Sequence, residues 1–188
     1  MQSLRFGLRS IAFVLATLSL VAATPPMVGN KAPEFSLDSV HGTAVRLSDL
    51  TAKSPVALIV LRGYPGYQCP FCQRQVQEFI EKAKAFTDAG VQVVFVYPGP
   101  PADLNNKANE FLEGKNFPDS FQMLLDPDYK FTNLYGLRWD APKETAYPST
   151  FLIDGKGVIY FEKMAKLHGG RATAAEVLDL LPKKPQAR

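Results

Sequence analysis

The sequence predicts an α/β fold, and three observations lead to that prediction. Two continuous apolar runs, Pro55–Leu61 and Val91–Tyr97, have the length and composition of strands buried on both faces. Between them, apolar residues recur at helical spacing from Cys72 until Gly90, which supplies a helix stop. A later hairpin and a final helix follow. This order of elements is typical of parallel strands packed against helices.

The elements on either side of the two buried runs are predicted as follows. Phe35–Leu37 and Ala44–Leu47 alternate apolar and polar residues around a glycine turn, which indicates a hairpin. After the second buried strand, a proline-rich stretch gives way to a moderate helix over Asp103–Glu113. A short strand, Phe121–Leu125, then ends at an Asp-Pro-Asp sequence, and a helical segment is expected over Tyr129–Tyr135.

The last third of the chain carries clearer signals. Thr150–Asp154 and Val158–Phe161 flank a Gly-Lys-Gly sequence, which predicts a second hairpin. Thr173 followed by Glu176 forms a capping box, so a last amphipathic helix is expected from there through Leu181. A polar tail follows.

The N-terminus resembles a secretory signal peptide. Arg5 and Arg9 precede an uncharged apolar stretch, Ile11–Ala23, that ends in small residues, so cleavage is expected after Ala23. The stretch is short for a membrane span, which needs about 20 residues, and an uncleaved anchor is the minority alternative. The predicted organisation is a signal peptide over 1–23, a linker over 24–32, one domain over 33–182 and a tail over 183–188.

Charge and compartment limit the possible functions. The 188-residue chain has a net charge of +3, and removal of the two arginines in the signal peptide lowers it to +1. A nearly neutral mature chain has no global electrostatic attraction for nucleic acid. We expect no membrane association beyond export, and a periplasmic or secreted location, where disulfides persist. The sequence has no glycine pattern for nucleotide binding and no cofactor is expected.

Both cysteines of the chain, Cys69 and Cys72, lie in the stretch YPGYQCPFCQRQ. A disulfide that closes so small a loop contributes only about 2 kcal/mol to stability, which argues against a structural staple. Zinc usually takes four ligands, and the remaining candidates, His41 and His168, are remote in sequence, so no metal site is expected. A two-coordinate Cu(I) site remains an alternative. Redox chemistry is the favoured use of the pair.

The expected position of the pair supports that use. The cysteines open the crossover helix and lie at the carboxyl end of a buried strand, where open α/β sheets place their ligand sites. A thiolate at a helix N-terminus faces unpaired N–H groups, which lower its pKa by up to about one unit. Pro70 suits the first helical turn. Arg62 and Arg74 flank the motif and would lower the pKa further if they turned inward; a solvent-facing Arg62 is weighed equally.

Three further stretches resemble the thioredoxin-fold superfamily, on its peroxiredoxin side, the alkyl hydroperoxide reductase C and thiol-specific antioxidant (AhpC/TSA) group. VGNKAPEFSLDSVHGTAVRLSDL, residues 28–50, resembles the opening hairpin of that group. LLDPDYKFTNLYGL, residues 124–137, resembles its Asp-Pro-Asp loop, and YPSTFLIDGKGVIYF, residues 147–161, its late hairpin. The resemblance runs from about Val28 to Leu181. It implies a thioredoxin fold, a mixed central sheet flanked by helices, with an N-terminal β-hairpin extension.

The resemblance also implies site residues. In the peroxiredoxin pattern that begins at Pro65, Cys72 falls on the peroxidatic position and Cys69 replaces a hydroxyl residue. Pro148 stands where peroxiredoxins carry an arginine and where thioredoxins carry a cis-proline that faces the CxxC. The resemblance therefore implies a cis bond before Pro148 and a position of Pro148 beside the cysteine pair. A substrate groove is therefore expected from Pro65, Tyr147, Pro148 and Arg62, with Cys69 and Cys72 forming the redox-active disulfide.

The predicted function is an exported thiol-dependent oxidoreductase that uses Cys69 and Cys72 to reduce hydroperoxides. Reduction of periplasmic protein disulfides is the alternative enzyme activity, and a Cu(I)-binding module the alternative outside enzymes. The expected partners are a hydroperoxide or protein disulfide and an external thioredoxin-like dithiol. Which cysteine attacks is left open. His41, His168 and Trp139 are interpreted as turn or loop residues outside the chemistry.

Overall fold

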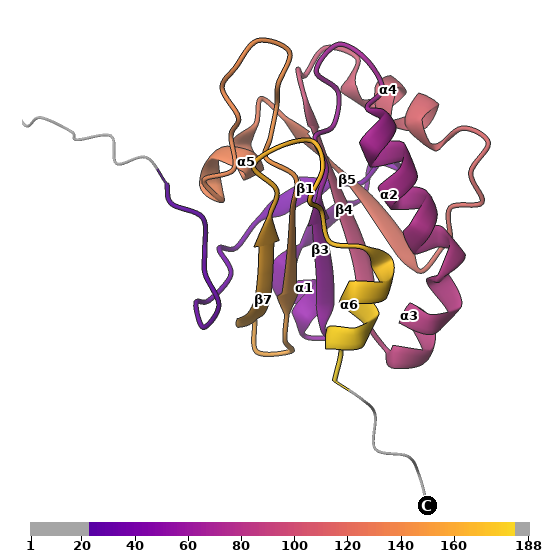
Figure 1. Cartoon of the computed structure of the whole chain (residues 1–188), viewed down its shortest axis with the longest axis vertical. Coiled ribbons are helices and arrows are strands. Elements are labelled where there is room, and N and C mark those ends of the chain that lie inside the picture. The colour runs from indigo at the N-terminus through magenta and orange to yellow at the C-terminus, as the bar shows by residue number, and fades with distance from the viewer. Residues whose placement is uncertain (1–22, 183–188) are drawn as a thin grey trace, which may run out of the picture.

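The structure is a computed structural model, and it describes residues 23–182. A five-stranded sheet with the strand order β5-β4-β3-β6-β7 forms its centre (Figure 1). The predicted signal peptide, apart from Ala23, and the predicted tail lie outside the described residues. Among the described residues, no helix is both long enough and apolar enough to cross a membrane.

The two continuous apolar runs form the middle of the sheet, as predicted. β3 (Val56–Val60) pairs in parallel with β4 (Gln92–Gly99), and β4 pairs in parallel with β5 (Phe121–Pro127). On the other side of β3, β6 (Ser149–Ile153) runs antiparallel and pairs with β7 (Ile159–Met164), which confirms the late hairpin. The sheet is therefore mixed, and the thioredoxin-type α/β fold is confirmed.

Alternate residues of β3 enter two separate cores, which is why the run is apolar without interruption. Ala57 and Ile59 face the core under α2 (Pro70–Glu81), α3 (Ala83–Ala89), α4 (Leu104–Leu112) and α6 (Ala174–Leu180). Leu58 and Val60 face the core under α1 (Leu47–Thr51) and α5 (Lys130–Leu134). Both faces of the sheet are thus covered (Figure 1).

The N-terminal hairpin forms from β1 (Ser36–Asp38) and β2 (Ala44–Arg46), as expected. The residues before it are held against the sheet, because Gly29 N–H donates to the Ile159 carbonyl at 2.8 Å and Ala32 N–H to the Gly157 carbonyl at 2.9 Å. The second half of the segment expected to be a linker therefore packs beside the start of β7.

Two local expectations need adjustment. The single helix predicted up to Gly90 is interrupted at Lys82, whose φ of −103° and ψ of 9° separate α2 from α3; Gly90 ends α3 in the left-handed conformation, as predicted. The capping box of α6 is half formed. Thr173 accepts from the Glu176 N–H at 3.1 Å, but the Glu176 carboxylate pairs with Lys163 at 2.7 Å instead of returning to Thr173.

Candidate active site

The two cysteines lie where β3 ends and α2 begins. Cys69 is the N-cap residue of α2, Pro70 occupies its first turn, and Cys72 follows in that turn. Both are free thiols. Their side chains are almost inaccessible, with 1% of Cys69 and 0% of Cys72 exposed to solvent. The site is closed in this conformation.

The surroundings of the two sulfurs shift the pKa values of the two thiols in opposite directions. The Cys72 thiol donates a hydrogen bond to the Cys69 sulfur and, against the opposing effect of burial, lowers the pKa of Cys69 to about 5. The Cys72 backbone N–H, Arg171 and Arg62 also lower the pKa of Cys69. Burial and the same hydrogen bond raise the pKa of Cys72. These opposite shifts favour the thiolate at Cys69 and the proton at Cys72.

Arg171 is a cation that contacts both sulfurs, and no sequence motif indicates it. Its Nη1 lies 3.4 Å from the Cys72 Sγ, and its Nη2 lies 4.0 Å from the Cys69 Sγ. Nη1 also donates to Gln75 Oε1 at 3.0 Å, and Gln75 in turn donates to the Ala172 carbonyl at 3.1 Å. Arg171 is separated from the cysteines by about half of the chain, so no local motif indicates it.

Arg62 turns inward and is 1% exposed, which decides between its two predicted orientations. Its guanidinium pairs with the Glu144 carboxylate, donates to the Lys143 carbonyl, and donates to the Tyr67 hydroxyl at 2.8 Å. Arg62 also lowers the pKa of Cys69. Arg62 thus provides a second positive charge at the thiolate.

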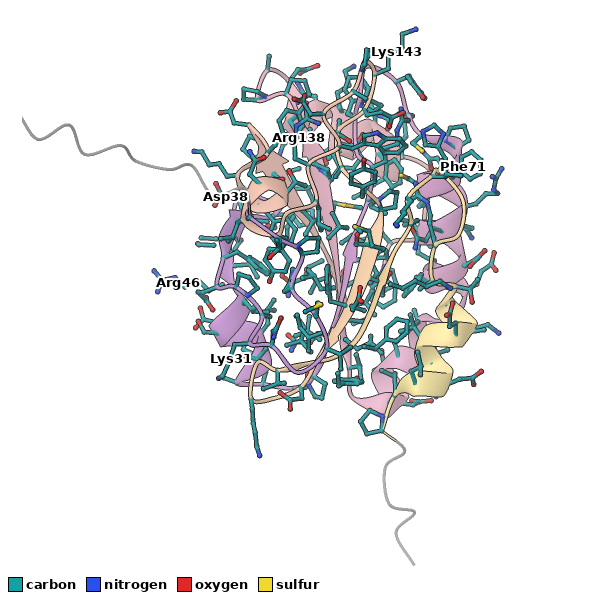
Figure 2. The ribbon with its side chains drawn as sticks, turned by 60° about the vertical axis from the view of Figure 1, so that its left-hand side comes forward. Lys31, Asp38, Arg46, Phe71, Arg138 and Lys143 are labelled. Carbon is teal, nitrogen blue, oxygen red and sulfur yellow. The ribbon has the colours of Figure 1, made fainter. Side chains whose placement is uncertain are left out.

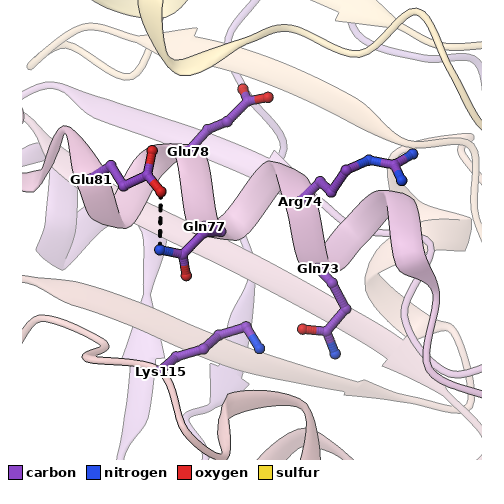
Figure 3. A pocket seen from close by; sticks show the side chains of 6 residues that line it. All are labelled: Gln73, Arg74, Gln77, Glu78, Glu81 and Lys115. Atoms are coloured by element: carbon purple, nitrogen blue, oxygen red, sulfur yellow. Dashed lines mark hydrogen bonds between the residues drawn. The ribbon is translucent and has the colours of Figure 1, made fainter.

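Arg74 turns outward. Its guanidinium lies over the Phe71 ring, 4.7 Å from the ring centroid. Figure 3 shows it on the outer face of α2, beside a shallow surface hollow. The hollow is lined by Gln73, Arg74, Gln77, Glu78, Glu81 and Lys115. Cys72 is on the buried face of α2, so Arg74 does not contribute the inward charge that its position allowed.

Glu144 and His168 join two segments that meet beside the thiols. His168 Nε2 lies 3.0 Å from Glu144 Oε1. Burial opposes ionisation of Glu144, but hydrogen bonds from Arg62 and His168 outweigh it and lower its pKa. The His168 ring also contacts the rings of Phe71 and Trp139, with centroids 5.9 and 5.4 Å apart. His168 and Trp139, interpreted from sequence as ordinary loop residues, are therefore part of the site wall.

The other predicted groove residues take different places. Tyr147 stacks on Trp139 with centroids 4.8 Å apart and so reaches the site wall indirectly. Pro65 is half-buried in the loop that leads to Cys69, and Pro148 is buried at the start of β6. In Figure 2, Phe71 on α2 and Lys143 at the tip of its loop mark this end of the molecule, and Lys31 lies at the other end.

The prediction of a cis bond before Pro148 is wrong, because the Tyr147–Pro148 bond is trans. Ala146 forms an isolated antiparallel β-bridge with Arg138. The Tyr147 N–H donates to the Leu137 carbonyl, and the Pro148 carbonyl accepts from the Ala165 N–H. The chain thus runs extended into β6 without the tight turn that favours a cis-proline, and the trans isomer is lower in free energy by about 0.5–1 kcal/mol.

Gln68, the residue before Cys69, is anchored by two further side-chain contacts. Its Oε1 accepts from the buried Tyr97 hydroxyl at 2.7 Å, and its Nε2 donates to the Lys107 carbonyl at 2.8 Å. These bonds tie the cysteine loop to β4 and α4. Within residues 23–182, no cluster of three or more His, Cys, Asp or Glu side chains is arranged to hold a metal ion.

The chain is similar to several known proteins. The sequence model of the AhpC/TSA family matches residues 28–162. Peroxiredoxin Bcp of Bacillus subtilis is 29% identical over 164 residues, which cover 84% of this chain and 98% of that protein. Thiol-disulfide oxidoreductase ResA of Geobacillus thermodenitrificans is 26% identical over 170 residues, which cover 90% and 85%.

A solved structure supports the same fold. Peroxidoxin BcpB of Mycobacterium tuberculosis superposes with a TM-score of 0.66 at 23% identity and covers 82% of this chain and 93% of that chain.

Proposed function

The chain belongs to the AhpC/TSA family and is a thiol-dependent oxidoreductase, and from that premise we propose that it reduces hydroperoxides with Cys69 as the nucleophile and Cys72 as the resolving thiol. The observation that carries the proposal is the convergence of two arginines, Arg171 and Arg62, on a thiolate at Cys69. A thiolate attacks the peroxide oxygen, and flanking guanidinium groups stabilise the negative charge that develops on the leaving oxygen.

The closed site favours a small substrate. Both sulfurs are almost inaccessible, so a bulky protein disulfide has no path to either without a large opening of the surrounding segments. A hydroperoxide presents only two oxygen atoms to the sulfur and requires a much smaller opening.

The reaction proceeds in three steps. The Cys69 thiolate attacks one peroxide oxygen, the O–O bond breaks, Cys69 becomes a sulfenic acid and the alkoxide or hydroxide leaves and takes up a proton. The Cys72 thiol then attacks the Cys69 sulfur, and water leaves as the Cys69–Cys72 disulfide forms. An external dithiol reduces this disulfide by exchange and is itself oxidised to a disulfide.

This assignment differs from the one that the family motif implies, in which Cys72 takes the oxygen. Burial and the shared hydrogen bond keep Cys72 protonated, while Cys69 carries the charge. Once Cys69 is a neutral sulfenic acid, the negative charge that helps to raise the pKa of Cys72 is gone. Cys72 can then give up its proton to the departing hydroxyl and attack the Cys69 sulfur in the second step.

Reduction of protein disulfides is the second candidate. The low pKa of the first cysteine of a CxxC favours it, because such a thiolate is also the attacking group in thiol–disulfide exchange. The similarity to ResA supports the same chemistry. In this case Cys69 again attacks, but the sulfurs must first become exposed.

One comparison tests the proposal. The reduced protein, supplied with a thioredoxin-like dithiol, is assayed for consumption of hydrogen peroxide and cumene hydroperoxide and, separately, for reduction of insulin disulfides. We expect peroxide turnover well above that of the dithiol alone, and insulin reduction no faster than that of the dithiol alone. Rapid insulin reduction without peroxide turnover would establish the second candidate instead. We further propose that the chain acts outside the cytosol, after removal of residues 1–23.

A further inference from the structure

The segment from Ala165 to Ala172 connects β7 to α6 and carries Arg171 to the sulfurs. Both ends are fixed by backbone contacts: the Ala165 N–H donates to the Pro148 carbonyl at 2.8 Å, and the Ala172 carbonyl accepts from Gln75 at 3.1 Å. The middle is open. Leu167 is 71% exposed, and Gly169 and Gly170 follow His168, with Gly170 at a φ of +75°.

Side-chain contacts hold this glycine-containing segment in place. His168 Nε2 bonds to Glu144 at 3.0 Å, and the His168 carbonyl accepts from Arg171 Nε at 2.8 Å. Glu144 is itself fixed by its ion pair with the buried Arg62. A continuous path therefore runs from Arg62 through Glu144 and His168 to the guanidinium that spans Cys69 and Cys72.

We propose that His168 and Glu144 are positioning residues, which hold Arg171 against the two sulfurs by fixing the segment from Ala165 to Ala172. Neither residue acts on the substrate. Their effect passes through the His168 carbonyl, which orients the Arg171 side chain. The inference rests on the proposed function for the reaction that Arg171 assists, but the placement of Arg171 is measurable without any peroxide.

The physical reason is the freedom of the glycine pair. Without the contact between His168 and Glu144, Gly169 and Gly170 allow the backbone before Arg171 many more conformations. Arg171 then spends less time near the thiolate. An opposite charge within about 4–6 Å lowers the pKa of an acid by about 1–3 units, so loss of this placement raises the pKa of Cys69 measurably.

Two substitutions of His168 separate the hydrogen bond from ring packing. His168→Phe keeps a ring beside Phe71 and Trp139 but removes the bond to Glu144, and His168→Gln keeps a donor within reach of Glu144 but removes the ring. Leu167→Ala is the matched control on the same segment. Thiolate absorbance at 240 nm is recorded against pH for each reduced protein.

We expect the wild-type midpoint near the pKa of about 5. His168→Phe is expected to raise the midpoint by about one unit, His168→Gln to restore most of that shift, and Leu167→Ala to leave it unchanged. An unchanged midpoint in His168→Phe would overturn the proposal, as would equal shifts in the Phe and Gln variants.

A double-mutant cycle tests whether the effect passes through Arg171. If His168 acts by placing Arg171, then His168→Phe adds no further shift to an Arg171→Met background. An equal shift in both backgrounds means that His168 acts on the thiolate by another route, and the proposal fails. Absence of peroxide turnover in the wild type would refute the proposed function while leaving this result intact.

Discussion

Arg62 and Arg74 flank the cysteine pair in sequence, yet they have different physical roles. Arg62 is buried, and its donors are shared among Glu144, Tyr67 and Lys143. Arg74 lies in solvent over Phe71. A buried guanidinium needs such partners because burial removes its hydration. If the guanidinium is removed, the paired carboxylate is left as an uncompensated buried charge.

Arg62→Met is therefore expected to lower the free energy of unfolding by about 3 kcal/mol, because Glu144 is left without its main counter-ion. Arg74→Met is the matched control, and we expect a change within about 0.5–1 kcal/mol, the range of an exposed cation–π contact. Urea unfolding of the reduced proteins measures both. Equal effects would show that Arg62 does not stabilise the site in this way.

The pH dependence of peroxide oxidation follows from the acidity of Cys69. Its pKa is lowered to about 5, so the reactive thiolate is nearly complete at neutral pH and is lost as the pH falls through that value. The second-order rate constant should be flat above pH 7, about half-maximal near pH 5 and about tenfold lower at pH 4. Rapid mixing across this range checks the profile. A steep rise between pH 7 and 9 would instead indicate an ordinary thiol.

At the scale of elements, α5 depends on one buried carboxylate for its start. Asp126 is the penultimate residue of β5, accepts from the Phe131 N–H at 2.7 Å and the Thr132 N–H at 3.0 Å, and is fully buried. These bonds satisfy two of the donors that a helix N-terminus leaves free. Burial raises the pKa of Asp126, although the two backbone N–H groups oppose that shift.

Asp126→Ala should therefore lower the free energy of unfolding by about 2 kcal/mol, since two buried N–H groups lose a charged acceptor. Asp119→Ala, at an exposed position, should change it by less than about 0.5 kcal/mol. Denaturant titration of both variants at neutral pH makes the comparison. A loss at Asp126 no larger than at Asp119 would contradict this account of the start of α5.

The sequence predicts those helix ends that depend on the residues next to them. The start of α2 was predicted because a cysteine followed by proline suits a helix N-terminus, and the end of α3 because Gly90 accepts a left-handed conformation. Helix α1 was missed: it is five residues long, and such a helix depends on tertiary contacts such as burial of Leu47 and Leu50. The break at Lys82 was missed because the apolar spacing continues on both sides of it.

At the scale of the whole molecule, the site is built from segments that the fold brings together. The cysteine loop, the segment with Glu144 and the segment with His168 and Arg171 meet at one end of the sheet, although Arg171 lies 99 positions after Cys72 (Figure 1). The sequence indicated the cysteines because they form a motif. It did not indicate Arg171 or Glu144, since their partners are fixed only by long-range packing.

Export is also a property of the whole chain. The proposal that residues 1–23 are removed rests on the sequence alone, and it predicts a mature protein that begins at Thr24 and fractionates outside the cytosol. Mass spectrometry of the intact protein from cell fractions measures the N-terminus. A cytosolic chain that retains Met1 would refute the proposed export but would leave the chemistry of the cysteines untouched.

The most direct test of the central claim is a single-turnover reaction of the reduced protein with hydrogen peroxide in a stopped-flow instrument. The wild type, Cys69→Ser and Cys72→Ser are compared, and a sulfenic acid probe is added after mixing. We predict rapid disulfide formation in the wild type, no rapid phase in Cys69→Ser, and a sulfenic acid that accumulates on Cys69 in Cys72→Ser. Rapid oxidation that survives in Cys69→Ser but is lost in Cys72→Ser would contradict the assignment of Cys69 as the nucleophile.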